Sequence, residues 1–197
     1  MLLFPPGGLV AYADESFLED RERGYYVVAT AVIDPAHLDH ARQVMLDLRG
    51  TRRTGKTHWT EMDRQERKRA ATRVAAIEGM HIVAVGTPVP PRRQERARAR
   101  CLEHLVAELY GYGVSTLVME SRTRDLDQRD IRAVIGARRA LPKGTRFAIE
   151  HTAGAVEPLL WVADVLAGAV RADRHGEESY RSILAERIYD FDVDTGC

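Results

Sequence analysis

The sequence predicts a three-layer α/β protein in which a mixed sheet of about five strands is flanked by helices. Short runs rich in Val and Tyr alternate along the chain with longer segments of strong helix formers, which is the pattern of an α/β domain. The length of 197 residues suits a single domain, residues 1–197, with a substantial core. An apolar content of 45% and a charged content of 29% are those of an ordinary globular protein.

The first half of the chain is predicted to contain three strands and two helices. "GGLVAYADES" has a glycine pair before an apolar run, which favours a strand at about 9–14, and "GYYVVATAVID" (24–34) is rich in Tyr and Val. An Asp-Pro pair then opens a helix that Gly50 can close. Strong helix formers fill 61–79, and "MHIVAVGTPV" (80–89) is a third strand that prolines end.

The second half continues the alternation of helices and strands. Its predicted elements are a long helix at 92–113, a strand at 114–120, a polar helix at 123–141, a strand at 145–151, an apolar helix at about 157–173 and a last helix within 177–189. The tail "YDFDVDTGC" is expected to fray or to lie at an edge of the sheet.

Composition argues for a cytoplasmic protein without a membrane anchor. The formal net charge is zero, so no overall positive field indicates a nucleic-acid partner, although a local basic cleft is compatible with it. The two cysteines have no metal-type spacing, which makes a disulfide framework improbable and a reducing compartment the default. The opening "MLLFPPGG" is too short for a signal peptide, and no apolar run could span a bilayer. Composition does not decide the oligomeric state.

Carboxylates fall where strands end and inside an apolar helix. Asp14 ends the first predicted strand and Glu120 ends the fourth, so both would reach the same edge if these strands are parallel neighbours. Asp164 lies in the middle of "EPLLWVADVLAGAV", where an unpaired carboxylate would be costly. On its helix face, the small Ala167 and Gly168 would allow close approach to the sheet.

Converging carboxylates predict a divalent-metal site. Three of them, or four with Glu61 of "HWTEM", would repel one another without a cation. Oxygen ligands and the absence of Cys/His clusters favour Mg²⁺ or Mn²⁺ over zinc. Two such ions suit phosphodiester cleavage, in which one activates water and the other stabilises the leaving oxygen. His58 and His151 are candidate general acids or bases near this site.

Each candidate also has a structural interpretation. Asp14 could cap a turn, Glu61 could stabilise a helix N-terminus, and His58 could serve a loop. Glu120 could form an ion pair with Arg122 or Arg124, and Asp164 could pair with Arg171, seven residues further along the same helix face.

Two basic stretches are candidates for phosphate contact. "GTRRTGKT" (50–57) satisfies the string GxxxxGK[ST], but a P-loop needs a strand before it and a helix after it, and here a helix precedes. Arg52, Arg53 and Lys56 could still touch nucleic-acid phosphates, and Arg122 is a further candidate. "RRQERARAR" (92–100) is either a solvated helix face or a phosphate-binding rim.

The chain resembles the DUF3800 family, whose members have an RNase H-like fold. The matching pieces are "AYADES", "HWTEM", "LVMESR" and "PLLWVADVLAGAV", which span nearly the whole chain in the family's order. The resemblance implies that Asp14, Glu120 and Asp164 hold two Mg²⁺ or Mn²⁺ ions for nucleic-acid cleavage. In the superfamily three strands run consecutively before the first helix, whereas here a helix follows the second strand. This departure bears most on the assignment of Glu61 as a fourth metal ligand.

Three functions are therefore considered from the sequence. The first is a metal-dependent nuclease of RNase H-like type. The second is a non-catalytic module that binds nucleic acid or protein and keeps the fold. The third is a P-loop nucleotide-binding protein, which would bind ATP or GTP through Lys56.

Overall fold

A six-stranded mixed sheet forms the centre of the molecule in a computed structural model that describes residues 8–50 and 55–197. The strand order is β5-β4-β1-β2-β3-β6. β2 is antiparallel to both β1 and β3, whereas β4 is parallel to β1, β5 to β4 and β6 to β3. The strands are β1 (Leu9–Leu18), β2 (Tyr25–Ile33), β3 (Gly79–Thr87), β4 (Val114–Glu120), β5 (Ala148–Thr152) and β6 (Ile188–Asp194).

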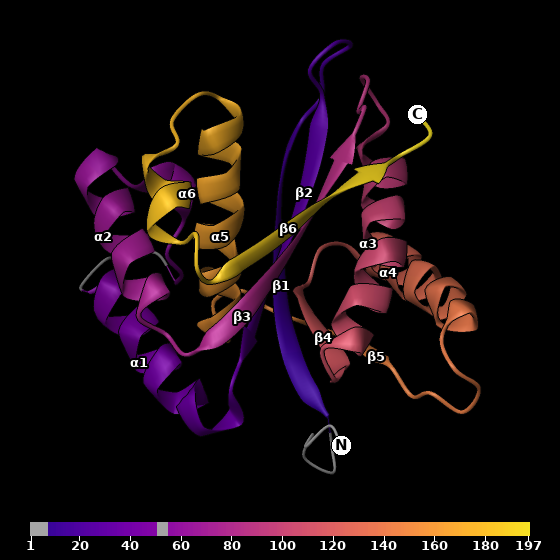
Figure 1. Ribbon diagram of the computed structural model, residues 1–197, viewed down its shortest axis with the longest axis horizontal. Coiled ribbons are helices and arrows are strands. Elements are labelled where there is room, and N and C mark those ends of the chain that lie inside the picture. Colours follow the sequence, from indigo (N-terminus) through magenta and orange to yellow (C-terminus); the bar gives the residue numbers. More distant parts are fainter. Residues whose placement is uncertain (1–7, 51–54) are drawn as a thin grey trace.

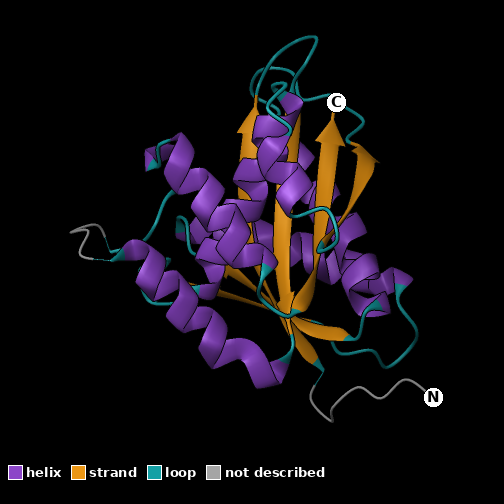
Figure 2. Cartoon of the chain, turned by 60° about the vertical axis from the view of Figure 1, so that its left-hand side comes forward, coloured by secondary structure: helices purple, strands orange, loops and turns teal. Residues whose placement is uncertain are grey.

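Helices cover both faces of this sheet (Figure 1). The α-helices are α1 (Leu38–Arg49), α2 (Arg64–Ala75), α3 (Gln94–Gly111), α4 (Arg124–Ala137), α5 (Leu159–Arg174) and α6 (Ser179–Ile183). α1, α2, α5 and α6 lie on one side and α3 and α4 on the other, so the protein has the three layers expected from the sequence. In Figure 2 the α5 side is turned toward the viewer, in front of the strands.

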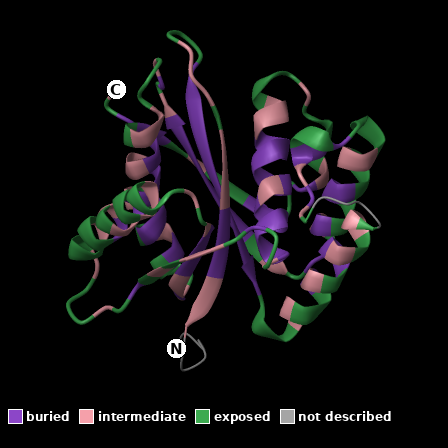
Figure 3. Ribbon diagram, turned by 180° about the vertical axis from the view of Figure 1, so that it is seen from behind, coloured by how far each residue is buried: buried purple, intermediate pink, exposed green. Residues whose placement is uncertain are grey.

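Strand alternation divides the core into two layers. All nine residues of β2 are buried, and successive side chains point to opposite faces, as the period of a strand requires. Tyr25 and Val27 pack in the layer with α5, whereas Tyr26 and Val28 pack in the layer with α3. Figure 3 shows buried central strands beside helices whose outer surfaces are exposed. The apolar run in α5 is explained by its 11 buried residues.

The structure corrects two details of the predicted elements. The acidic tail takes the edge position that was one of the two expectations for it, as β6, which pairs with β3 and raises the number of strands from about five to six. The helix expected to begin at 61 begins at Arg64, because Asp63 caps it through the backbone N–H of Glu66 and the Glu66 side chain accepts from the N–H of Asp63. Glu61 therefore lies in a short 3-10 helix, Trp59–Glu61, ahead of α2.

Two α-helices separate β2 from β3, which confirms the departure from three consecutive strands. Among residues 8–50 and 55–197, no helix combines the length and apolar character needed to cross a lipid bilayer.

Candidate functional site

Two neighbouring parallel strands bring Asp14 and Glu120 together. β1 and β4 pair in parallel with Ala13 opposite Met119, so the next residue on each strand is one of these two acids. Both side chains lie on the α5 face, because they have the same parity as Tyr12 and Val118, which pack in the core layer of α5. The condition set by the sequence, that these strands are parallel neighbours, is met.

The third carboxylate comes from α5, which packs across β1 and β2. Asp164 lines a pocket of about 330 Å³ together with Asp14 and Glu120. Lys56 and His58, from the segment that precedes α2, line the same pocket. Side chains from opposite ends of the chain therefore meet at one end of β1.

Each acidic side chain in the pocket has one identified donor. The backbone N–H of Glu15 donates to Asp14 Oδ1 at 2.8 Å, and the backbone N–H of Trp59 donates to Asp164 Oδ2 at 2.6 Å. Lys56 Nζ donates to both carboxylate oxygens of Glu120 at 2.5 Å. The described residues give no donor to Asp14 Oδ2 or Asp164 Oδ1, so these two oxygens are available to a ligand.

Burial and mutual repulsion disfavour the charged state of the two aspartates. The pKa of Asp14 is raised well above its ordinary value, first by burial and then by the charges of Asp164 and Glu15. Burial also raises the pKa of Asp164 to about 6, although the Trp59 N–H and the nearby His58 and Lys56 act in the opposite direction. The pocket thus holds more negative charge than its own cations balance.

The donor set fits a hard divalent cation. Two aspartates with free oxygens on rigid elements, and a glutamate beside them, are the ligands that Mg²⁺ and Mn²⁺ prefer. Among the described residues, the carboxylate oxygens of Asp14, Glu120 and Asp164 do not all lie within 4.8 Å of one another, and Lys56 engages both oxygens of Glu120. Asp14 and Asp164 therefore each keep one carboxylate oxygen without a donor among the described residues, whereas Glu120 is shared with Lys56.

Two glycines make room for the site. A Cβ at Gly168 would collide with the indole of Trp59. Because Gly168 has no side chain, Trp59 can pack against it and donate its backbone N–H to Asp164. The sequence predicted a small residue here for contact with the sheet, and the contact is instead with Trp59. A Cβ at Gly154 would meet the Glu120 carboxylate at 2.5 Å. The sequence analysis gave no role to Trp59 or Gly154, and the small Ala167 and Gly168 were its indication of close packing.

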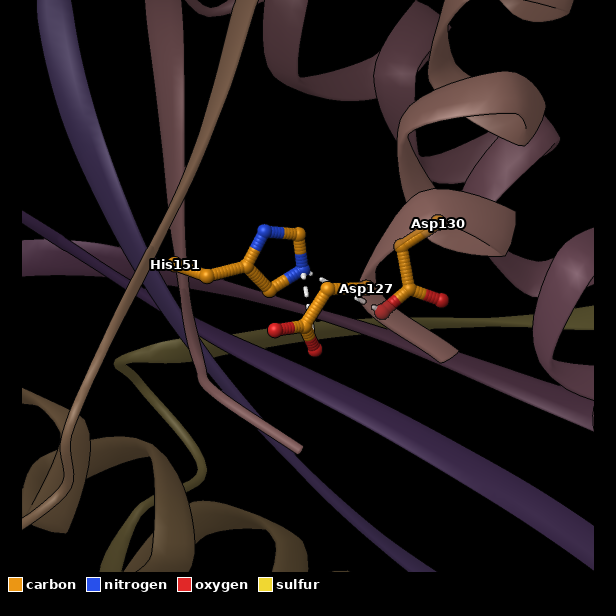
Figure 4. A group of neighbouring side chains, drawn as sticks. All are labelled: Asp127, Asp130 and His151. Carbon is orange, nitrogen blue, oxygen red and sulfur yellow. Dashed lines mark hydrogen bonds and ion pairs between the residues drawn. The ribbon is translucent and has the colours of Figure 1, made fainter. Parts of the chain in front are cut away.

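A second group of potential ligands, Asp127, Asp130 and His151, lies on the opposite face of the sheet (Figure 4). These are the described side chains whose ligand atoms all lie within 4.8 Å of one another. Arg98 donates to both oxygens of Asp130 at 2.8 and 2.9 Å, and Arg122 donates to it at 3.1 Å.

Despite the burial of Asp130, hydrogen bonds from His151 and Arg98 and the charges of Arg98 and Arg122 hold the pKa of its carboxyl well below the ordinary value. Its charge is already neutralised, so we assign the group to a buried ion-pair network.

The structure separates several predicted site residues from the carboxylate pocket. His151 pairs with Met119 in the sheet and faces α4, because its parity is opposite to that of Glu120, and its Nε2 lies 3.3 Å from Asp130. Glu61 is exposed and does not line the pocket. Arg122 is engaged by Glu95 at 2.7 Å and by Asp130. His151, Glu61 and Arg122 therefore do not line the carboxylate pocket, which corrects the expectation that they lie with Asp14 and Asp164.

The basic stretches also differ from their sequence interpretation. In the stretch 92–100, Arg98 is 1% exposed and pairs with Glu15 and Asp130, so it belongs neither to a solvated face nor to a phosphate rim. The expectation that a helix precedes the P-loop-like string is confirmed, since α1 lies ahead of the segment, and Lys56 binds Glu120. Arg52 and Arg53 lie outside the described residues. Glu120 pairs with Lys56 rather than with Arg122 or Arg124.

Comparison with solved structures gives a likeness at low sequence identity. The sequence matches no family model and no curated protein, so the DUF3800 resemblance rests on the quoted motifs. A solved structure of a mutant protein of Bst-RNase HIII is similar, with a TM-score of 0.41 and 15% identity. The match covers 85% of this chain and 55% of that chain, so this chain spans little more than half the length of that protein.

Proposed function

We propose that this protein is a divalent-metal-dependent nuclease that hydrolyses phosphodiester bonds of DNA or RNA. Asp14 and Asp164, assisted by Glu120, are the proposed metal ligands. The observation that carries the proposal is the convergence of these carboxylates on one pocket, where two of them have raised pKa values. Such crowding is costly without a cation and typical of functional sites.

The surrounding side chains suggest a division of roles. Mg²⁺ or Mn²⁺, as two ions if the RNase H-like resemblance holds, would supply an activated water and stabilise charge on the phosphate. Asp14 lies on a central strand and Asp164 on a buried helix, so both are held rigidly. His58 lines the pocket and is partly exposed, which allows it to exchange a proton with the substrate.

Lys56 adds a positive charge to the pocket. Its Nζ balances Glu120 in the absence of other cations, and it is placed to contact a substrate phosphate once Glu120 takes part in metal binding. The motifs "AYADES" and "PLLWVADVLAGAV", which carry Asp14 and Asp164, support the same proposal through their resemblance to the DUF3800 family.

The test is a cleavage assay on single- and double-stranded DNA, RNA and RNA/DNA hybrids with Mn²⁺ or Mg²⁺. Asp14→Asn and Asp164→Asn should reduce cleavage at least ~100-fold while circular dichroism shows that the native fold is kept. Asp125→Asn, an exposed acid on the opposite side of the sheet, should cleave normally. Activity that survives in both site variants would refute the proposal.

A non-catalytic binding module is the second candidate, and the Lys56–Glu120 ion pair favours it. A carboxylate already neutralised by an ammonium can serve stability alone. This candidate expects nucleic-acid or protein binding without metal-dependent cleavage of any substrate, and equal binding by wild type and Asp164→Asn.

A further inference from the structure

A basic pocket lies directly beside the carboxylate pocket. Its volume is about 560 Å³, and it is formed by α2, α5 and the segment around α6. The two pockets share four lining residues, Trp59, Thr60, Gly168 and Arg171. They therefore adjoin one another along α5, the carboxylate pocket at Asp164 and the second, basic pocket toward the C-terminal end of the helix. Asp164 and Arg171 are seven residues apart on this helix, which corresponds to about 10 Å.

The second pocket carries an excess of positive charge. Arg64, Arg67 and Arg171 line it, and Glu177 is its one acidic lining residue. Arg64 reaches Glu177 at 3.1 Å, but its side chain is 83% exposed, so this pair contributes little and exchanges readily with another anion. The described residues place no carboxylate within 4.0 Å of Arg171, whose hydrogen bond to Ser16 Oγ is long at 3.4 Å.

Arg67 is held in position by the residue that also holds Asp164. Its Nε donates to the backbone carbonyl of Trp59 at 3.2 Å, and its guanidinium lies 5.3 Å from the Trp59 ring centroid. Trp59 in turn donates its backbone N–H to Asp164. One residue thus fixes both a proposed metal ligand and a cation of the neighbouring pocket.

The two large aromatic residues of this pocket are buried. Trp59 is 4% exposed and Tyr180 is 3% exposed, and the two rings pack edge to face at 5.1 Å. The exposed ring in the lining is that of His175, so a nucleobase would find little aromatic surface here, whereas a phosphate would find two or three guanidinium groups. Planar guanidinium donors match phosphate oxygens well.

We propose that this basic pocket binds a backbone phosphate of the nucleic-acid strand whose neighbouring phosphodiester lies at the carboxylate pocket. The inference rests on the proposed function and adds the path of the bound strand, which runs across the protein from Asp164 toward Arg171. Recognition is through the backbone, so binding is independent of base sequence. The zero net charge of the chain is compatible with this, because the positive charge is local.

The test is binding of a fluorescently labelled single-stranded oligonucleotide, measured by anisotropy in EDTA at about 50 to 200 mM salt. Arg171→Ala should weaken binding about tenfold and lower the slope of log K against log salt by about one. Arg171→Lys should retain part of the affinity. Arg129→Ala, which removes an exposed arginine from α4 on the opposite side of the sheet, should leave affinity and slope unchanged.

A gain-of-affinity variant makes the test specific to this pocket. Glu177→Gln removes its one acidic lining residue and frees Arg64, so binding should tighten roughly two- to fivefold. Unchanged binding in both Arg171→Ala and Glu177→Gln would overturn the inference, even if metal-dependent cleavage is observed. Conversely, a protein that shows these binding changes but never cleaves would refute the nuclease proposal and leave the phosphate pocket standing.

Discussion

The two raised carboxyl pKa values make stability depend on pH in a definite direction. A carboxyl that binds its proton more tightly when folded favours the folded state at acid pH, and that contribution is lost as pH rises. For Asp164 the window runs from its ordinary pKa of 3.8 to about 6. Above about pH 6 the metal-free pocket is destabilising, by up to about 3 kcal/mol for a shift of this size.

We therefore predict that Asp164→Asn stabilises the metal-free protein relative to wild type at about pH 7 more than at about pH 4. Thermal melts in EDTA across this range measure the difference between the two proteins, so titrations elsewhere cancel. Saturating Mn²⁺ should raise the melting temperature of wild type at about pH 7 and have little effect at about pH 4, where the ligands are protonated. A difference that grows toward acid pH would contradict the assigned pKa directions.

Lys56 competes with any cation for Glu120, which gives a second prediction at the scale of one residue. Lys56→Met keeps the aliphatic stem and removes the ammonium that holds both Glu120 oxygens. Mn²⁺ should then bind several-fold more tightly in calorimetry, and the stoichiometry should show whether the freed glutamate supports a second ion. Lys143→Met, an exposed substitution distant in sequence, is the matched control. Weaker Mn²⁺ binding by Lys56→Met would show that the lysine supports the metal site rather than competing with it.

At the scale of elements, sequence patterns predicted the strands and helices best where burial is uniform. The strand at 24–34 and the apolar helix near 157–173 agree closely with β2 and α5, because most of their residues are buried. The start of α2 was missed since helix propensity does not reveal that Asp63, rather than an earlier residue, makes the cap. β6 was predicted only as one of two alternatives, a frayed tail or an edge segment, because its exposed acids resemble a solvated tail.

The contact between α5 and the 3-10 helix Trp59–Glu61 is predicted to be intolerant of added volume. Gly168→Ala places a methyl group into the Trp59 indole, which must move and carry its N–H away from Asp164. We expect a loss of about 1–3 kcal/mol in the free energy of unfolding, measured by urea denaturation, and reduced Mn²⁺ affinity. Gly136→Ala is the control, because a Cβ there meets nothing within 4 Å and the helical position should gain up to about 1 kcal/mol. Equal effects of the two substitutions would show that Trp59 does not need the space.

At the scale of the whole molecule, the candidate site could be predicted only where strand ends fix position. Asp14 and Glu120 were found because parallel neighbours end at a common edge, and Asp164 because it interrupts an apolar helix. The face of the sheet on which His151 lies depends on the register of β5, and no local sequence pattern reveals that register. Arg98 looks like one of many surface arginines until the sheet, α3 and α4 are assembled around it.

The network around Arg98 ties the layer of α3 and α4 to the strand that carries Asp14. Arg98 comes from α3, Asp130 from α4 and Glu15 from β1, and Arg98 and Asp130 are almost wholly buried. Removing one partner leaves a buried charge uncompensated, which is far more costly than losing an exposed pair. The network thus holds β1, the strand that carries Asp14, in place from the opposite face of the sheet.

We predict that Asp130→Ala lowers the free energy of unfolding by about 3–5 kcal/mol, whereas the exposed Asp125→Ala on the same helix changes it by less than about 0.5 kcal/mol. Because the network is neutralised by arginines, the loss should be the same in EDTA and in Mn²⁺. Urea denaturation under both conditions separates this structural role from metal binding. If the loss appeared only when Mn²⁺ was present, the group of Asp127, Asp130 and His151 would be a metal site after all, and the carboxylate pocket at Asp14 would lose its claim to be the one that binds the ion.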